Sequence, residues 1–110
     1  MLSVIVPAYK QGQTIKKDLE NIDHILSSGL KGENYEIICV VDGKVDNTFE
    51  EAQKVKSPRI KLVELEQNKG KGYAVRFGMS KAKGNLISFL DAGRDISPKG
   101  IMMLMAHMNW

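Results

Sequence analysis

The sequence predicts an α/β domain built on an open, mainly parallel sheet with helices on both faces. Three observations lead to this prediction. Short, continuous apolar runs recur along the chain, as in strands that are buried on both faces. Segments with helical spacing of apolar residues alternate with these runs, which gives the order β-α-β-α-β-α-β-α. Polar, acidic and glycine residues gather where the apolar runs end.

Length and composition limit the kind of protein that this chain can be. Its 110 residues allow one small domain, and the 43% of apolar residues is enough for a core. The net charge of +3 suits an anionic ligand or a membrane surface, but it is too small to indicate nucleic-acid binding. No run reaches the roughly 18 apolar residues of a membrane-spanning helix, and we expect no signal peptide.

Cys39 is the single cysteine and lies inside an apolar run, so the sequence predicts no internal disulfide. A buried free thiol is typical of a reducing compartment. We therefore expect a cytoplasmic protein, either free or at the cytosolic face of a membrane.

The first strand is expected at residues 2–8, where apolar residues follow one another almost without a break. Pro7 should end it, because proline has no N–H to donate to a neighbouring strand. Thr14 is the expected N-cap of a first helix whose apolar side chains recur at three-to-four spacing: Ile15, Leu19, Ile22 and Leu26. A second buried strand is expected at residues 37–41.

The middle of the chain carries a second helix and a weaker strand. Asn47 and Glu50 resemble a capping box that begins this helix. Its narrow apolar stripe consists of Phe49, Ala52 and Val55. The pair at residues 57–58, Ser-Pro, should end the helix. Residues 60–66 alternate imperfectly between apolar and charged side chains, which is typical of an edge strand.

The last third of the chain repeats the alternation of helix and strand. A third helix is expected over about residues 73–83, closed by Gly84, and a fourth strand over about residues 86–90. Ser97 as the cap and Pro98 at the first helical position then begin a last helix. Strands that alternate with helices in this way form parallel sheets with right-handed crossovers.

The ends of the expected strands are the predicted location of a binding site, because open parallel sheets bind ligands beyond the carboxyl ends of their strands. Polar, acidic and glycine residues cluster at these ends, whereas the strand bodies are apolar. The four ends lie at residues 7–9, 41–43, 66–70 and 90–93.

Two common nucleotide-binding signatures do not match this sequence. The dinucleotide fingerprint needs G-x-G-x-x-G after a strand, and the turn at residues 9–12 lacks that pattern. Gly70 and Gly72 supply two of the glycines, but Val75 stands where the third is needed. The Walker loop is also missing. An NAD enzyme and a P-loop NTPase are therefore disfavoured, as is a nucleotidyltransferase, which would need a glycine-rich loop after the first strand.

Four blocks resemble, in order and spacing, the N-terminal half of a family 2 glycosyltransferase. They are residues 3–9 (SVIVPAY), 40–48 (VVDGKVDNT), 68–78 (NKGKGYAVRFG) and 89–95 (FLDAGRD). The third block is the most specific, and it is similar to one frequent in the polyprenyl-phosphate (dolichol-phosphate type) sugar transferases. Any one block is weak, whereas four blocks in the right order are a strong resemblance.

The resemblance implies the GT-A fold, in which this chain is a Rossmann-like half domain that binds a UDP- or GDP-linked sugar. The implied donor-binding residues are Pro7, Ala8, Tyr9, Gln11, Asp42, Lys71, Gly72, Arg76 and Asp91. Our hypothesis for the metal is that Asp91 and Asp95 ligate Mg2+ or Mn2+, with diphosphate oxygens and water completing the shell.

Several of these residues also have a simpler structural interpretation. Asp42 either caps a turn before Gly43 or, as the resemblance implies, accepts a hydrogen bond from the base or the ribose. Lys71 is either a solvated loop lysine or a contact to the diphosphate or base. Arg76 either pairs with a strand-end carboxylate or faces solvent. Asp46 is expected to cap the second helix and is left out of the site.

The chain departs from the family pattern at positions that bear on metal and donor binding. Gly93 stands where the family's D-x-D metal motif has its second carboxylate, and the loss of a charged ligand should weaken metal binding. The other departures are Val41 for an aspartate, Lys44 for a serine and Gln11 for a frequent glutamate. A non-catalytic nucleotide-sugar-binding module is therefore the alternative to an enzyme.

For the whole enzyme, the resemblance implies transfer of the sugar with inversion to a polyprenyl phosphate or a saccharide. A divalent cation would offset the charge that builds on the leaving diphosphate. The chain stops just after a Met-rich segment at residues 101–105, so we expect residues 1–110 to be a donor-binding half truncated at its C-terminus. The catalytic base and the acceptor site are then expected beyond Trp110, and a lipid acceptor would bring the full-length protein to a membrane.

Overall fold

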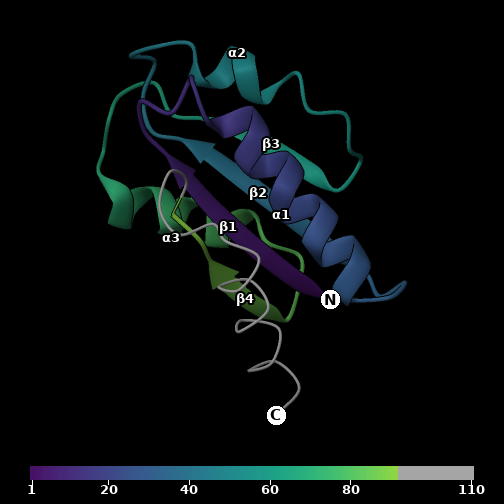
Figure 1. The fold of residues 1–110 in the computed structure, drawn as a ribbon. Coiled ribbons are helices and arrows are strands. Elements are labelled where there is room, and N and C mark those ends of the chain that lie inside the picture. Colours follow the sequence, from purple (N-terminus) through teal and green to yellow (C-terminus); the bar gives the residue numbers. More distant parts are fainter. Residues whose placement is uncertain (92–110) are drawn as a thin grey trace.

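A four-stranded parallel sheet forms the centre of the structure, a computed structural model that describes residues 1–91 (Figure 1). The strands lie in the order β3-β2-β1-β4 and are β1 (Leu2–Ala8), β2 (Tyr35–Val41), β3 (Ile60–Glu64) and β4 (Leu86–Phe89). The helices are α1 (Ile15–Gly29), α2 (Thr48–Ala52) and α3 (Lys71–Lys81). The predicted α/β class and the element order up to β4 are confirmed. The helix predicted from Ser97 lies outside the described residues.

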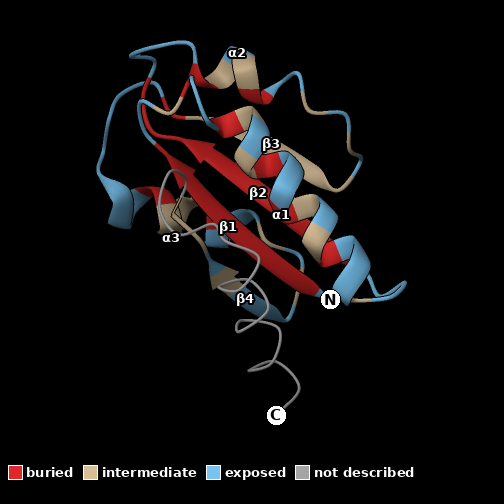
Figure 2. Ribbon diagram, in the orientation of Figure 1, coloured by how far each residue is buried: buried red, intermediate tan, exposed pale blue. Residues whose placement is uncertain are grey.

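Helices cover both faces of the sheet, as predicted. Val4 and Val6 of β1 pack with α1 on one face. Ile5, between them, packs with Val40 of β2 and Ala74 of α3 on the other face. Successive side chains of a strand point to opposite faces, so a strand that is covered on both sides is apolar at nearly every position. β1 and β2 are covered in this way, and Figure 2 shows both strands buried along their whole length.

The apolar stripe of α1 anchors this helix to the sheet. Its four predicted core side chains are all fully buried: Ile15, Leu19, Ile22 and Leu26. Burying one such side chain contributes about 1.5–3 kcal/mol. Thr14 occupies the N-cap position as predicted but makes no capping bond, and its hydroxyl donates to Oε1 of Gln11 (3.0 Å). α1 has 15 residues, and no helix within residues 1–91 is both long and apolar enough to cross a bilayer.

Pro7 lies inside β1 and ends only one of its two hydrogen-bonded ladders. The carbonyl of Ile5 accepts the N–H of Leu90 (2.9 Å), so Ile5 and, two residues on, Pro7 face β4. Pairing with β4 stops at Ile5 and Phe89, whereas pairing with β2 continues to Ala8. The missing N–H of proline therefore shortens β4 rather than β1.

α2 and β3 are both shorter than the sequence indicates. α2 ends at Ala52, and the predicted capping box is wrong because Asn47 makes no capping bond. The carboxylate of Asp46, the residue before the N-cap, accepts the N–H of Thr48 instead (3.0 Å), so Asp46 satisfies one free N–H at the start of α2. β3 ends at Glu64 and lies at an edge of the described sheet, as predicted.

α3 begins and ends two residues before the predicted range. It starts at Lys71, directly after the N-cap Gly70, and ends at Lys81. The prediction that Gly84 closes this helix is wrong. An added Cβ at Gly84 would collide with the carbonyl oxygen of Met1, so a glycine is needed for the chain to pass beside the start of β1.

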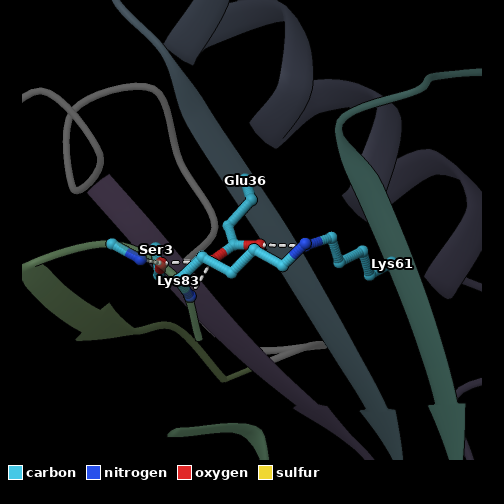
Figure 3. Close-up of polar contacts among 5 residues, drawn as sticks. Ser3, Glu36, Lys61 and Lys83 are labelled. Carbon is cyan, nitrogen blue, oxygen red and sulfur yellow. Dashed lines mark hydrogen bonds and ion pairs between the residues drawn. The ribbon is translucent and has the colours of Figure 1, made fainter. Parts of the chain in front are cut away.

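A buried carboxylate ties together the amino-terminal ends of the strands (Figure 3). Oε1 of Glu36 accepts the ammonium of Lys61 (2.6 Å), and Oε2 accepts the hydroxyl of Ser3 (2.5 Å) and the N–H of Lys83 (2.6 Å). The hydroxyl of Ser3 in turn accepts the N–H of Gly84 (2.9 Å). Burial raises the pKa of Glu36, but these donors outweigh it and lower the pKa from 4.5 to about 2.

The same network explains why β2 begins at Tyr35, two residues before the predicted start. Ser3 and Glu36 stand opposite each other in the β1–β2 register, so their hydrogen bond lies within the sheet. From the sequence alone, the charged Glu36 next to an apolar run indicates that the strand has not yet begun, because the partner that would satisfy its carboxylate is unknown. Here the partner supplies a hydroxyl, which allows the carboxylate to be buried.

Candidate functional site

Asp42 follows β2 directly and is only 3% exposed. Its N–H donates to the carbonyl of Ala8 (2.8 Å), which extends the pairing of β1 and β2 by one residue. Oδ1 of Asp42 accepts the N–H of Lys69 (2.8 Å), and Oδ2 accepts the N–H of Gly70 (3.0 Å). A buried carboxylate without such donors would be strongly destabilising. Asp42 therefore fixes the loop that precedes α3.

Glycines allow this loop to lie directly against the end of β2. Gly43 has φ +102°, and an added Cβ would lie 2.9 Å from the backbone nitrogen of Asn68. Both the positive φ and the close approach exclude a side chain at this position. Gly70 has φ +94°, and its N–H also donates to Oδ1 of Asn68 (3.0 Å). The loop is thus closed by short-range contacts before α3 begins.

Lys71, the first residue of α3, connects this loop to the end of β4. Its ammonium lies 2.6 Å from Oδ2 of Asp91 and 5.6 Å from the centroid of the Phe89 ring. The side chains of Lys71 and Asp91 are 56% and 26% exposed, so a ligand can reach the pair. Exposed ion pairs of this kind contribute at most about 1 kcal/mol to stability. An incoming anion can therefore take the place of Asp91 beside Lys71, and an incoming cation can take the place of Lys71 beside Asp91.

The structure therefore brings Asp42, Lys71 and Asp91 into one connected set. Asp42 binds the loop, the loop leads into Lys71, and Lys71 binds Asp91. The three residues come from the end of β2, the start of α3 and the segment after β4. This is the carboxyl-end edge of the sheet, where the sequence predicts the site.

The block that follows β1 contributes one accessible side chain to this edge. Pro7 and Ala8 are buried within β1, whereas Tyr9 is 39% exposed. Gln11 is engaged within the protein, because its N–H donates to Oγ1 of Thr48 (2.9 Å). Tyr9 is therefore the member of the block whose side chain a ligand can contact most readily.

A hollow of about 320 Å³ lies between the β1–α1 and β2–α2 connections. Gln11 is the predicted site residue in its lining, which also includes Lys10, Gly12, Gln13, Thr14, Asp46 and Asn47. Asp46 joins the two connections, because its carboxylate accepts the N–H of Gly12 (3.2 Å) and of Thr48 (3.0 Å). The hydroxyl and N–H of Thr48 lower the pKa of Asp46, against the opposing effect of burial.

Gly72 and Arg76 lie one helical turn apart on the exposed side of α3. An added Cβ on Gly72 would lie 3.5 Å from a guanidinium nitrogen of Arg76, which is an ordinary contact. None of the ion pairs within residues 1–91 involves Arg76. Of the two alternatives for Arg76, the described part of the chain shows the solvent-facing one.

Asp91 is the described member of the predicted metal pair, since Asp95 lies outside the described residues. Within residues 1–91, no group of three or more His, Cys, Asp or Glu side chains is placed to hold a metal ion. A Mg2+ ion, however, is usually bound by one or two carboxylates together with substrate phosphates. The partly exposed carboxylate of Asp91 suits that kind of shell, and Lys71 supplies the positive charge beside it.

The fold defines a class of protein, the open parallel α/β domains, here with acidic, lysine and glycine residues beyond the strand ends. Comparison with known families gives the particular one. The family described as Glycosyl transferase family 2 matches residues 3–110. The chain belongs to this family, which confirms the predicted resemblance.

Curated relatives and solved structures agree with this assignment. The chain is 40% identical over 98 residues to a dolichyl-phosphate beta-glucosyltransferase of Drosophila melanogaster, covering 83% of this chain and 30% of the relative. It is 32% identical over 105 residues to a dolichol-phosphate mannosyltransferase of Pyrococcus furiosus, covering 94% and 29%. A glucosyl-3-phosphoglycerate synthase from Mycobacterium tuberculosis, solved with Mn2+, UDP and phosphoglyceric acid, matches with a TM-score of 0.66 at 26% identity, covering 84% and 32%. The chain thus spans less than a third of each of these relatives.

Sequence reasoning did not identify the contacts of Gly43 and Phe89. Gly43 follows a strand-end aspartate, and that Asp-Gly pair indicated a turn, although not the close approach of the loop at residues 68–70. The ring of Phe89 lies beside Lys71, and this side chain is 51% exposed. The apolar sequence of β4 indicated burial instead, and no local signal pointed to this contact.

Proposed function

We propose that the protein carrying this chain is a glycosyltransferase that moves a sugar from a UDP- or GDP-linked donor to an acceptor with inversion. Residues 1–110 supply the donor-binding half of its catalytic domain. Membership of glycosyl transferase family 2 supports this proposal, as do the relatives named for transfer of glucose or mannose. The structural relative that binds UDP and Mn2+ adds support for the donor.

The connected set of Asp42, Lys71 and Asp91 is the observation that carries the proposal. A diphosphate needs cationic side chains and a positive helix end, and Lys71 supplies a cation at the start of α3. The Lys71 ammonium lies beside the carboxylate of Asp91. In a metal-bound diphosphate at this position, the metal would contact Asp91 and a phosphate oxygen would contact Lys71. Tyr9 and Arg76, two exposed members of the predicted donor set, would contact the rest of the donor.

Mg2+ or Mn2+ is the proposed cation, with Asp91 and Asp95 as its protein ligands. When bound, the cation offsets the negative charge that develops on the leaving diphosphate. Lys71 would share that task, because its ammonium can move from Asp91 to a phosphate oxygen without leaving the site.

A lipid-linked phosphate is the proposed acceptor, because the curated relatives at 40% and 32% identity are named for dolichyl phosphate. A phosphate acceptor is already anionic and needs no base, whereas a saccharide hydroxyl would need a carboxylate to remove its proton. A lipid acceptor would place the protein at the cytosolic face of a membrane.

Calorimetry of the whole protein with UDP- and GDP-sugars, with and without Mn2+, tests the proposal. We expect one donor class to bind, and Asp91→Asn to weaken the Mn2+-dependent binding by about tenfold or more. Glu20→Gln is the matched control, because Glu20 forms an exposed ion pair with Lys16 on α1 and should bind donor like the wild type. If neither donor class binds in either condition, the proposal is wrong.

A non-catalytic nucleotide-sugar-binding module is the second candidate function. Gly93 favours it, because the family pattern has a carboxylate at that position. Such a module would bind the donor equally well without Mn2+ and would transfer no sugar. Transfer of radiolabelled sugar from the bound donor to a polyprenyl phosphate, dependent on Mn2+, would exclude this candidate.

A further inference from the structure

We propose that Asp42 is a positioning residue, which holds the loop at residues 68–70 and thereby determines where Lys71 lies. This inference rests on the proposed donor site at this edge of the sheet. The family resemblance assigns the carboxylate of Asp42 to the base or the ribose. In the structure, each oxygen already accepts a backbone N–H, at 2.8 and 3.0 Å, and the residue is 3% exposed. Its bonds are directed at the loop rather than at an open surface.

The path from Asp42 to Lys71 is short and consists of backbone contacts. Oδ2 of Asp42 binds the N–H of Gly70, which is the N-cap of α3 and the residue directly before Lys71. Hydrogen bonds to an ionised group are roughly twice as strong as neutral ones. Asp42 itself is fixed to β1 through the carbonyl of Ala8. The start of α3 is therefore held against the centre of the sheet, and Lys71 is placed with it.

Gly43 provides a second, independent observation for the same contact. Its missing side chain lets the backbone of Asn68 approach to a distance that a Cβ would block, at 2.9 Å from the nitrogen. The loop is thus held from two consecutive residues, by hydrogen bonds at Asp42 and by close packing at Gly43. Because Lys71 comes directly after this loop, both contacts constrain the position of Lys71.

Positioning and direct recognition of the base predict different losses of affinity. If Asp42 contacted the base, Asp42→Asn would weaken nucleoside monophosphate and diphosphate by the same factor. If Asp42 acts through Lys71, the variant loses the preference for UDP over UMP, or GDP over GMP, because the proposed function assigns Lys71 to the diphosphate. The ratio of the two affinities therefore separates the two roles.

The first measurement is amide hydrogen exchange of the ligand-free whole protein. In Asp42→Asn, the amides of Lys69 and Gly70 should exchange faster by about tenfold or more, because one acceptor becomes an amide donor. Amides within β1 and β2 should keep their wild-type rates. Unchanged exchange at Lys69 and Gly70 would overturn the proposal. This measurement needs no nucleotide, so it tests whether Asp42 holds the loop even if the protein binds no nucleotide sugar.

The second measurement is a double-mutant cycle on the ratio of diphosphate to monophosphate affinity. Asp42→Asn and Lys71→Met should each lower the ratio by about tenfold, and the double variant should lose no more than the larger single loss. Lys54→Met, which changes an exposed lysine just after α2, should leave the ratio unchanged. Additive losses, or equal losses for both nucleotides, would contradict a role through Lys71.

A second variant covers the case in which Asp42→Asn does not fold. Gly43→Ala displaces the same loop but keeps the carboxylate, so it should produce the same faster exchange and the same lower ratio. Normal exchange at Lys69 and Gly70 in a folded Gly43→Ala protein would contradict the proposal. Circular dichroism of each variant establishes that the comparison is made on folded protein.

Discussion

Two buried acidic residues, Glu36 and Asp42, stand at opposite ends of β2, and their hydrogen bonds give them different tasks. Glu36 accepts donors from the neighbouring strands and from the segment before β4, so it joins the sheet. Within residues 1–91, the carboxylate of Asp42 accepts hydrogen bonds from the loop before α3, so it acts on the edge that carries the candidate site. Changes at Glu36 should therefore alter stability, and changes at Asp42 should alter ligand binding.

Glu36→Gln should lower the free energy of unfolding by roughly 2–4 kcal/mol. The variant leaves the Lys61 ammonium beside a neutral amide. It also replaces one carboxylate oxygen of residue 36 with an NH2 group, which donates and therefore cannot accept the hydrogen bond that this oxygen of Glu36 receives from Lys61 or from Lys83. Urea denaturation followed by circular dichroism measures the loss. Glu20→Gln, on the exposed face of α1, should change stability by less than about 0.5 kcal/mol. A Glu36→Gln protein as stable as this control would contradict the structural role of the network.

The same residue predicts how stability depends on pH. The pKa of Glu36 is lowered from 4.5 to about 2 in the folded protein, so the unfolded chain binds more protons between these values. The contribution of Glu36 is therefore complete above pH 4.5 and is lost as the pH falls towards 2. The stability difference between wild type and Glu36→Gln should shrink over this range in acid denaturation curves. A difference that stays constant down to pH 2 would contradict the lowered pKa.

At the scale of single elements, the position of α3 matters most for the candidate site, because this helix carries Lys71. Gly78 faces the sheet, and an added Cβ would lie 2.5 Å from Cγ2 of Ile5 and 3.1 Å from Cγ2 of Val40. This close contact places the helix directly on β1 and β2. The helix is held at its start by Asp42 and along its length by this contact, and Lys71 is its first residue.

Gly78→Ala should destabilise the protein even though alanine is the better helix former. The gain in helix propensity is about 1 kcal/mol, whereas overpacking of a buried contact costs about 1–3 kcal/mol. We therefore expect a net loss of about 1–2 kcal/mol in thermal or urea denaturation. Gly72→Ala is the control for stability, because its Cβ would make an ordinary contact with Arg76. A Gly78→Ala protein more stable than the wild type would show that α3 is not packed this closely.

Elements whose burial depends on local pattern could be predicted from the sequence. β1 was predicted with its observed bounds, and the four core residues of α1 were all identified, because apolar spacing alone determines both. The starts of β2 and α3 could not be predicted. β2 starts early because Ser3 of a different strand satisfies Glu36, and α3 starts early because Asp42 holds Gly70. Both contacts join residues that are far apart in the chain.

At the scale of the whole molecule, the sheet has one structural end and one candidate functional end. The amino-terminal ends of the strands are joined by the Glu36 network (Figure 3). The carboxyl-terminal ends carry Asp42, Lys71 and Asp91. The location of the candidate site is a prediction from the general rule for parallel sheets, together with the family resemblance. The pairing of Lys71 with Asp91 could not be predicted, because it depends on the relative placement of α3 and β4.

Amide hydrogen exchange of the whole protein, with and without a UDP- or GDP-sugar and Mn2+, tests the central claim most directly. Donor bound at the carboxyl-end edge should protect the loop at residues 68–70, the start of α3 and the segment around Asp91. The segment around Glu36, at the other end of the sheet, should keep its rates. Protection that appears around Glu36 and Lys61 but not at the start of α3 would contradict the account.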